Sequence, residues 1–393
     1  MQADRTAHPI GWYRSPGRAI FRYLDFEDRP GENPWLDLLR CAAIGLVLAR
    51  HGHRAWIESA GAEPAWFDFI MLNGWMGVDL FFVLSGYLVG RILLRQGGGL
   101  GGLSTYLRRR ALRILPAYYA VLLATTLGAF PLYGFASQDL GQRLLYHLAM
   151  LQDYLSSDIN VVFWSLGVEV KFYLLAPFIL LLAARARSPG TLLCLLGVLV
   201  LLSTAVRLGI VLERGPPVDY AAFIPVFRHP AHAVGEPLML GAAAAVLGQR
   251  GLLRLGPRAA ARLLGASAAA ITGLAMSHEL MADISIFDIV FQPLLIALLF
   301  AAAVAAGAAL SDTHLPCARA ARIGARLAYP LYLTHFPLLP LSLAVAHAFD
   351  GAAAAFWTVF LGLSVASALA VHYAFEKPFL IARPTQAAAV RER

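Results

Sequence analysis

The sequence predicts an all-α integral membrane protein of about ten transmembrane helices, with both termini in the cytoplasm. Three observations predict this class. Hydrophobic residues make up 59% of the chain and charged residues only 14%, unlike the composition of a soluble domain. Apolar runs long enough to cross a bilayer recur along the chain. Arginines gather in every second link between these runs, as expected for links that stay in the cytoplasm.

The apolar runs define the predicted spans in chain order. They cover residues 36–57, 70–94, 111–134, 163–184, 191–212, 230–249, 260–277, 285–309, 326–348 and 354–376. We therefore expect a membrane domain at 35–380, an arginine-rich cytoplasmic tail at 1–34 and a short tail at 381–393. The tail at 1–34 has no apolar stretch typical of a cleavable signal peptide, and we expect it to lie at the membrane surface.

The charged residues fix the predicted orientation. The link after the second span contains no acidic residue and six arginines: Arg91, Arg95, Arg108, Arg109, Arg110 and Arg113. The odd-numbered links are acidic or mixed. The formal charge of +8 is thus explained by membrane orientation rather than by nucleic-acid binding. The three cysteines have no paired spacing, so we expect neither a disulfide framework nor a metal site.

The first span contains two ionisable residues, Arg40 and His51, eleven positions apart. Eleven steps of a helix return to within about 20° of the starting direction and rise about 16.5 Å. Both side chains should therefore lie on one face, with Arg40 near the cytoplasm and His51 in the outer half of the membrane. Buried ionisable groups in spans are functional candidates. The alternative is that Arg40 reaches lipid phosphates and His51 marks the helix end.

The second span runs inward and places Asp79 at about the depth of His51. An aspartate that orients this histidine would make it a base able to deprotonate a hydroxyl. Asp79 could equally cap the helix. In the same span, Ser85 followed by Gly86 resembles the nucleophile of an intramembrane hydrolase, but a packing notch of small residues is the favoured interpretation.

The third span begins with Arg110 and Arg113, three positions apart and so on one helix face. Guanidinium groups clustered at the cytoplasmic mouth could bind phosphates. The arginines alone favour a plain orientation signal.

Two more ionisable residues lie in later spans. Glu169, in the fourth span, is a candidate acid, base or acceptor of a sugar hydroxyl, or a structural carboxylate paired with an arginine. His335 lies between Pro330 and Pro337, where the backbone must be irregular and must face protein or a cavity. His335 is either a ligand-binding residue or a core histidine bonded to a freed carbonyl.

Six motifs occur in one order: Arg40 with His51, FFVLSGYL, RRALRILPAYY, WSLGVEVKFYLLAP, YLTHFP and FEKPF. Together they resemble the acyltransferase 3 family of membrane acyltransferases, over nearly the whole chain. The resemblance implies transfer of an acyl group, usually acetyl from cytoplasmic acetyl-CoA, to a hydroxyl of a carbohydrate or glycosylated acceptor. It implies a catalytic role for His51 and a donor-side role for Arg40, Arg110 and Arg113.

The chain departs from the family pattern after Glu169, where Val170 and Lys171 stand in place of a second carboxylate and its neighbour. A role that needs two carboxylates there is in doubt. We also expect no fused esterase-like domain to deliver the acceptor.

The sequence thus predicts an acyl-CoA-dependent O-acyltransferase of the bacterial inner membrane, without a metal. Its partners would be acyl-CoA, a carbohydrate or glycoside acceptor and membrane lipids. The rival hypothesis is an ion-coupled transporter or flippase of a glycolipid or organic anion, since intramembrane charges also suit transport. A purely structural membrane protein is a third.

Overall fold

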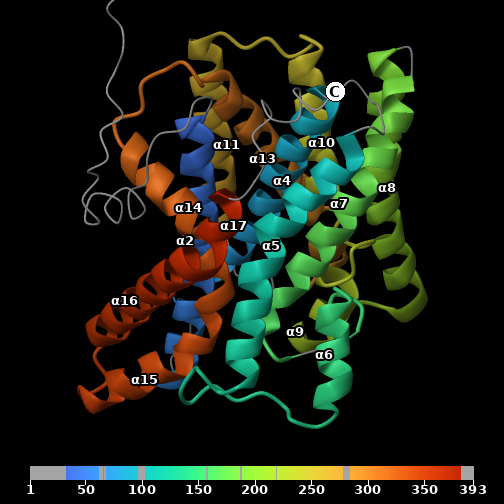
Figure 1. The fold of residues 1–393 in the computed structure, drawn as a ribbon. Helices are drawn as coiled ribbons and strands as arrows, with labels where there is room; N and C mark the ends of the chain where they lie inside the picture. Colours follow the sequence, from blue (N-terminus) through green and yellow to red (C-terminus); the bar gives the residue numbers. More distant parts are fainter. Residues whose placement is uncertain are drawn as a thin grey trace, which may run out of the picture. The chain divides into compact units, whose positions relative to one another are not determined.

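The structure is a computed structural model that describes residues 32–61, 65, 68–95, 102–155, 158–185, 188–217, 219–277 and 284–381. Throughout these residues the chain forms helices joined by loops, with no β-strand (Figure 1). The all-α prediction is confirmed for this part of the chain. The predicted tails at 1–34 and 381–393 lie outside the described residues, except for 32–34 and 381.

Each predicted span contains a helix. The first five spans fall on α2 (Pro34–Ala60), α4 (Met76–Arg95), α5 (Leu103–Thr126), α7 (Trp164–Arg185) and α8 (Pro189–Arg214). The next five fall on α10 (Glu236–Gln249), α11 (Pro257–Ser277), α13 (Gln292–Ala309), the pair α14 (Ala318–Thr334) and α15 (Leu339–Ala348), and α16 (Ala353–Val371).

Shorter helices extend or connect these elements. Before α4 and α13 lie α3 (Phe69–Leu72), η2 (Asn73–Trp75) and α12 (Ile286–Val290). The links contain α6 (Leu140–Leu148), η4 (Val161–Phe163), α9 (Tyr220–Phe223) and the π-helical turn η5 (Ile224–Arg228). The last elements are η6 (Phe336–Leu338), between α14 and α15, and η7 (His372–Glu376) and α17 (Lys377–Ile381), after α16.

Among the described residues, six helical stretches are long and apolar enough to cross a membrane, and a seventh is added if α14 and α15 form one bent span. The other three predicted spans fall on α2, α5 and α10. Charged residues run along α2 and α5, and α10 is only 14 residues long. The chain is therefore an integral membrane protein, while the count of ten spans and the cytoplasmic termini stay predictions.

Some predicted boundaries differ from the helix ends by six to eight residues, as at the third and sixth spans. The third span was expected at 111–134, but α5 covers Leu103–Thr126 because its backbone continues as helix through the polar arginine-rich turns. The sixth was expected to begin at residue 230, but α10 begins at Glu236 with Pro237 in its first turn. The π-helical turn η5 takes up the chain before it.

Close contacts between α4 and α10 set the centre of the helix packing (Figure 1). A Cβ atom on Gly86 would stand 2.0 Å from the backbone oxygen of Leu238, and one on Gly241 would stand 2.1 Å from that of Val83. Only glycine allows the two backbones this approach. Gly86 is therefore a packing notch, as the sequence favoured.

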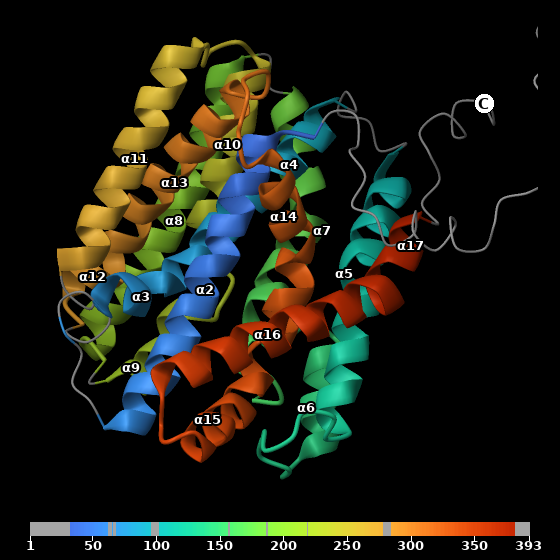
Figure 2. The ribbon, with the colours of Figure 1, turned by 90° about the vertical axis from the view of Figure 1, so that its left-hand side faces the viewer.

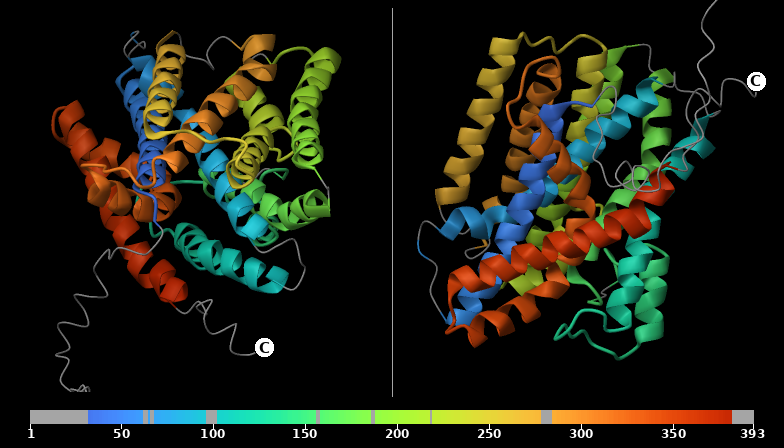
Figure 3. Two further views of the ribbon diagram at one scale, coloured as in Figure 1. Left: turned by 90° about the horizontal axis from the view of Figure 1, so that it is seen from above. Right: turned by 60° about the vertical axis from the view of Figure 1, so that its left-hand side comes forward.

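The remaining elements are arranged around α2 and α4. Helix α2 packs against α4 and α14, and α11 packs along α13 (Figure 3). Helix α16 crosses obliquely over α14, and its continuation η7 contacts α5 (Figure 2). The C-terminal end of the described chain is thus fastened to the arginine-rich part of α5.

The chain bends by 62° between α14 and α15. Pro337 has no N–H, so the carbonyl of Leu333 lacks its helical partner. Asn160 replaces this partner, since its side-chain nitrogen donates to the Leu333 oxygen at 3.0 Å. His335 is the residue at this bend and is fully buried.

Candidate active site

Two histidines from distant parts of the sequence meet inside the membrane domain. Nδ1 of His51, on α2, lies 2.8 Å from Nε2 of His335, at the end of α14. The rings stack with centroids 5.1 Å apart, and Phe336 meets the His51 ring edge-on at 5.2 Å. Nδ1 of His335 lies 3.0 Å from the Leu331 oxygen and 2.9 Å from the Tyr332 oxygen. His335 is thus a core histidine bonded to carbonyls of its own helical turn, and it also contacts His51. The Leu331 oxygen also accepts the backbone N–H of His335, so it is not a carbonyl freed by a proline.

The predicted pair of His51 and Asp79 is wrong. Asp79 accepts instead from Nη2 of Arg228, at 3.1 and 3.2 Å, and the Arg228 guanidinium lies 4.7 Å from the Trp75 ring centroid. Both members of this ion pair are buried. Depth in the membrane was a poor guide here, because Asp79 pairs with Arg228 of η5 and His51 pairs with His335 at the end of α14.

Arg40 lies on the same unbroken helix as His51, as expected from the eleven-residue spacing. Its guanidinium is 2.6 Å from the carboxylate of Asp37, and its side chain is one-quarter exposed. This pair holds Arg40 at the N-terminal end of α2.

Glu169 and Ser85 meet although they lie on different helices. Ser85 Oγ donates to Glu169 at 2.5 Å, and the Tyr173 hydroxyl donates to the same oxygen at 2.5 Å. Ser85 and Tyr173 are themselves 3.1 Å apart. The recorded partners of Ser85 are thus a carboxylate and a phenol, which are also bonded to each other.

Arg110 extends this cluster toward the N-terminal end of α5. Its guanidinium carbon lies 5.5 Å from the Tyr173 ring centroid and 5.8 Å from that of Tyr106. No carboxylate among the described residues lies within ion-pair distance of Arg110, and its Nε is buried without a partner. Arg110 is therefore a cation held by rings, with its charge uncompensated.

Arg113 has a different environment, although it lies one turn from Arg110. It forms an ion pair with Glu376, whose carboxylate is fully buried. The other Glu376 oxygen lies 2.6 Å from Nδ1 of His372. Arg113 thus anchors η7 to α5. In the sequence, the only sign of this pair is the presence of Glu376 in FEKPF.

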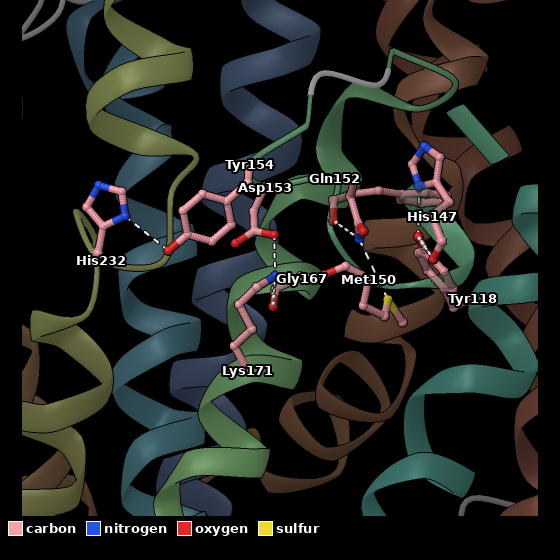
Figure 4. A network of polar contacts seen from close by, with 10 residues as sticks. Tyr118, His147, Met150, Gln152, Asp153, Tyr154, Gly167, Lys171 and His232 are labelled. Carbon is pink, nitrogen blue, oxygen red and sulfur yellow. Dashed lines mark hydrogen bonds and ion pairs between the residues drawn. The ribbon is translucent and has the colours of Figure 1, made fainter. Parts of the chain in front are cut away.

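Lys171 fastens the connection that precedes α7 (Figure 4). Its ammonium group donates to Asp153 at 2.5 Å and to the Met150 carbonyl at 2.7 Å, and it lies 5.3 Å from the Tyr154 ring centroid. Tyr154 in turn contacts Nδ1 of His232 at 3.0 Å. One position after Val170, which stands in place of the second carboxylate, this chain thus has a cation with a structural role.

The sequence analysis missed one more buried ion pair, Arg207 with Glu236. Both side chains are 1% exposed, and Arg207 also donates to the Val290 carbonyl at 2.9 Å. Both residues lie in predicted spans, so the rule that ionisable residues inside spans are functional candidates could have identified them. No group of three or more metal-ligating side chains occurs in the described part of the chain.

Comparison with known families decides what kind of protein this site belongs to. A family described as "Acyltransferase domain" matches residues 33–373, which is most of the sequence. The chain belongs to the acyltransferase 3 family. The match includes every candidate residue named above from Arg40 to His335, and it ends before Glu376.

The relatives of this acyltransferase 3 chain include proteins of Listeria monocytogenes and Bacillus subtilis. It is 27% identical over 176 residues to "Peptidoglycan O-acetyltransferase OatA" of Listeria monocytogenes, covering 41% of this chain and 26% of that protein. It is 28% identical over 197 residues to the Bacillus subtilis protein named "Putative peptidoglycan O-acetyltransferase YrhL", covering 46% and 29%. The aligned segments thus span about a quarter of these relatives. No solved structure matches the chain significantly.

Proposed function

We propose that this protein is a membrane O-acyltransferase that moves an acyl group, acetyl first among the candidates, from cytoplasmic acyl-CoA to a hydroxyl of a carbohydrate acceptor. The observation that carries the proposal is the pair of His51 and His335 within the membrane domain of an acyltransferase family member. His51 is only partly buried, as a residue that meets a substrate must be.

His51 acts as the general base of the transfer. Its free ring nitrogen takes the proton of the acceptor hydroxyl while the hydroxyl oxygen attacks the carbonyl carbon of the thioester. The carbon–sulfur bond then breaks, the CoA thiolate leaves, and it takes the proton back from His51. The products are the acyl ester and free CoA, and His51 returns to its neutral state.

Arg110 is the side chain best suited to the CoA phosphates. Arg40 and Arg113 each have a carboxylate partner, whereas Arg110 keeps an uncompensated charge between two tyrosine rings. A guanidinium held in a fixed orientation binds phosphate oxygens through paired hydrogen bonds. We therefore assign the main donor contact to Arg110 and a supporting role to Arg40 and Arg113.

The acceptor reaches His51 from the outer half of the membrane. His51 is 17 residues from the start of α2, a rise of about 25 Å, which separates it from the cytoplasmic arginines. Relatives with names that refer to peptidoglycan support a glycan as the acceptor class. The location we propose is the cytoplasmic membrane of a bacterium.

Calorimetric titration of acetyl-CoA into the purified protein in nanodiscs tests the donor assignment. We expect the wild type to bind, and Arg110→Ala to weaken binding at least tenfold because a charge-assisted phosphate contact is lost. The matched control is Arg91→Ala, since Arg91 also lies over a tyrosine ring near the cytoplasmic end of its helix; it should bind within twofold of wild type. Equal affinity for Arg110→Ala and wild type would contradict the assignment.

A further inference from the structure

Each contact of the histidine pair determines where one proton lies. The chain of contacts runs from the backbone oxygens of Leu331 and Tyr332 to Nδ1 of His335, and then from Nε2 of His335 to Nδ1 of His51. No hydrogen bond to Nε2 of His51 is recorded among the described residues. The pair therefore begins at fixed backbone and ends at an open nitrogen.

The contacts of Nδ1 of His335 with the two carbonyl oxygens determine the tautomer of His335. Carbonyl oxygens accept hydrogen bonds and never donate them. Nδ1 of His335 must therefore carry a proton, which it shares between the two oxygens. In the neutral ring, Nε2 of His335 then has a lone pair and no proton.

The tautomer of His335 decides that of His51. The contact of 2.8 Å between the two rings needs one proton, and neutral His335 has none to give from Nε2. Nδ1 of His51 must supply it, so Nε2 of His51 is left with a bare lone pair. The reverse arrangement would make His335 a cation that is fully buried, and the described residues place no carboxylate beside it to compensate the cost.

The position of His335 at the end of α14 also suits the charged state of the pair. When Nε2 of His51 takes a proton, the His51 cation donates through Nδ1 to His335, which makes the bond between the rings charge-assisted. The carbonyls of the last turn of α14 carry the negative end of the helix dipole, and they polarise His335 in the favourable direction.

We propose that His335 is a positioning residue, which holds His51 in the tautomer with its proton on Nδ1 and a bare lone pair on Nε2. The catalytic half of this inference rests on the proposed function, whereas the tautomer does not. Pro337 lies two residues after His335, and Asn160 donates to the Leu333 carbonyl that Pro337 leaves without its helical partner.

Nitrogen-15 NMR of the histidine side chains in nanodiscs tests the tautomer directly, with the His51 signals assigned by their loss in His51→Gln. We expect Nδ1 of His51 to be protonated and Nε2 to be unprotonated, the opposite of the tautomer that prevails for histidine in water. In His335→Leu the acceptor is gone, and the proton of His51 should move to Nε2. In His335→Gln the side-chain oxygen can accept from Nδ1, so the wild-type tautomer should persist.

Transfer of radiolabel from acetyl-CoA in membrane vesicles supplies the catalytic readout. At saturating donor we expect His335→Leu to lower the rate about 100-fold with little change in KM, and His335→Gln to recover most of it. His347→Gln, which changes a histidine bonded to Ser59 at the surface, is the matched control and should leave tautomer and rate unchanged.

A proton on Nε2 of His51 in the wild type would overturn the inference whatever the rates. A wild-type rate in His335→Leu would overturn its catalytic half. If the expected tautomers are found but no variant and no wild type transfers label, the positioning stands and the proposed function fails.

Discussion

At the scale of single residues, the sequence could indicate the functional candidates but not which residues they contact. The rule that charges inside spans are functional candidates found Arg40, His51, Asp79, Glu169 and His335. The same rule could not predict that Asp79 meets Arg228, because Arg228 comes from a π-helical turn that no apolar periodicity reveals. The missing N–H of Pro337 predicts that the Leu333 carbonyl needs another partner, but not that Asn160 supplies it.

The contrast between Arg110 and Arg113 leads to a prediction about stability. Arg113→Ala leaves the buried Glu376 carboxylate without its arginine, whereas Arg108→Ala removes an exposed arginine of the same helix. We expect Arg113→Ala to destabilise the protein by about 2 kcal/mol, a value below that for a fully buried pair because Arg113 is partly exposed. Thermal unfolding in detergent should show a lower midpoint for Arg113→Ala and an unchanged one for Arg108→Ala.

Measurement of acetyl-CoA binding distinguishes the donor-binding role proposed for Arg110 from the structural role of Arg113. Arg110→Ala should lose binding and lower the melting temperature less than Arg113→Ala does, because it removes two cation–π contacts but leaves no carboxylate of the described residues without its partner. If Arg113→Ala melted like the wild type, the structural role of the Arg113–Glu376 pair would be disproved.

At the scale of helices, apolar length predicted where helices lie but not which faces meet. Every predicted span contains a helix, since about 20 apolar residues have few other ways to satisfy their backbone in lipid. Boundaries set by polar turns were missed, as at α5, which begins eight residues before the predicted span. The small residues Ser85 and Gly86 predicted that another helix packs closely on α4, but they did not predict that this helix is α10.

Gly86→Ala tests this contact. The added methyl group would collide with a backbone oxygen of α10 that stands 2.0 Å away, so the helices must separate. We expect a cost of about 2 to 3 kcal/mol, measured as a lower thermal midpoint in detergent. Gly197→Ala, on α8, is the control because a Cβ there meets nothing within 4 Å. A Gly86→Ala protein as stable as the control would show that α4 and α10 do not pack this closely.

At the scale of the whole molecule, the sequence and the structure together support donor binding and proton transfer at different depths along the membrane normal. Predicted cytoplasmic links supply the arginines, and the histidine pair lies deeper along α2. In the function we propose, a donor from the cytoplasm meets an acceptor from the other side in this arrangement. A transporter would need no such separation of a phosphate-binding end from a base.

The central claim is that His51 drives acyl transfer from a cytoplasmic donor, and one measurement tests it most directly. Inverted membrane vesicles that contain the protein and its native acceptors are supplied with acetyl-CoA labelled in the acetyl group, and label in the glycan or lipid fraction is counted. Because acetyl-CoA does not cross membranes, intact right-side-out vesicles control for sidedness. Arg54→Ala, which removes an exposed side chain of the same helix, controls for expression and folding.

We expect the wild type and Arg54→Ala to transfer label and release CoA in inverted vesicles. In His51→Ala the rate of label transfer should fall at least about 100-fold. Wild-type transfer by His51→Ala would contradict the central claim.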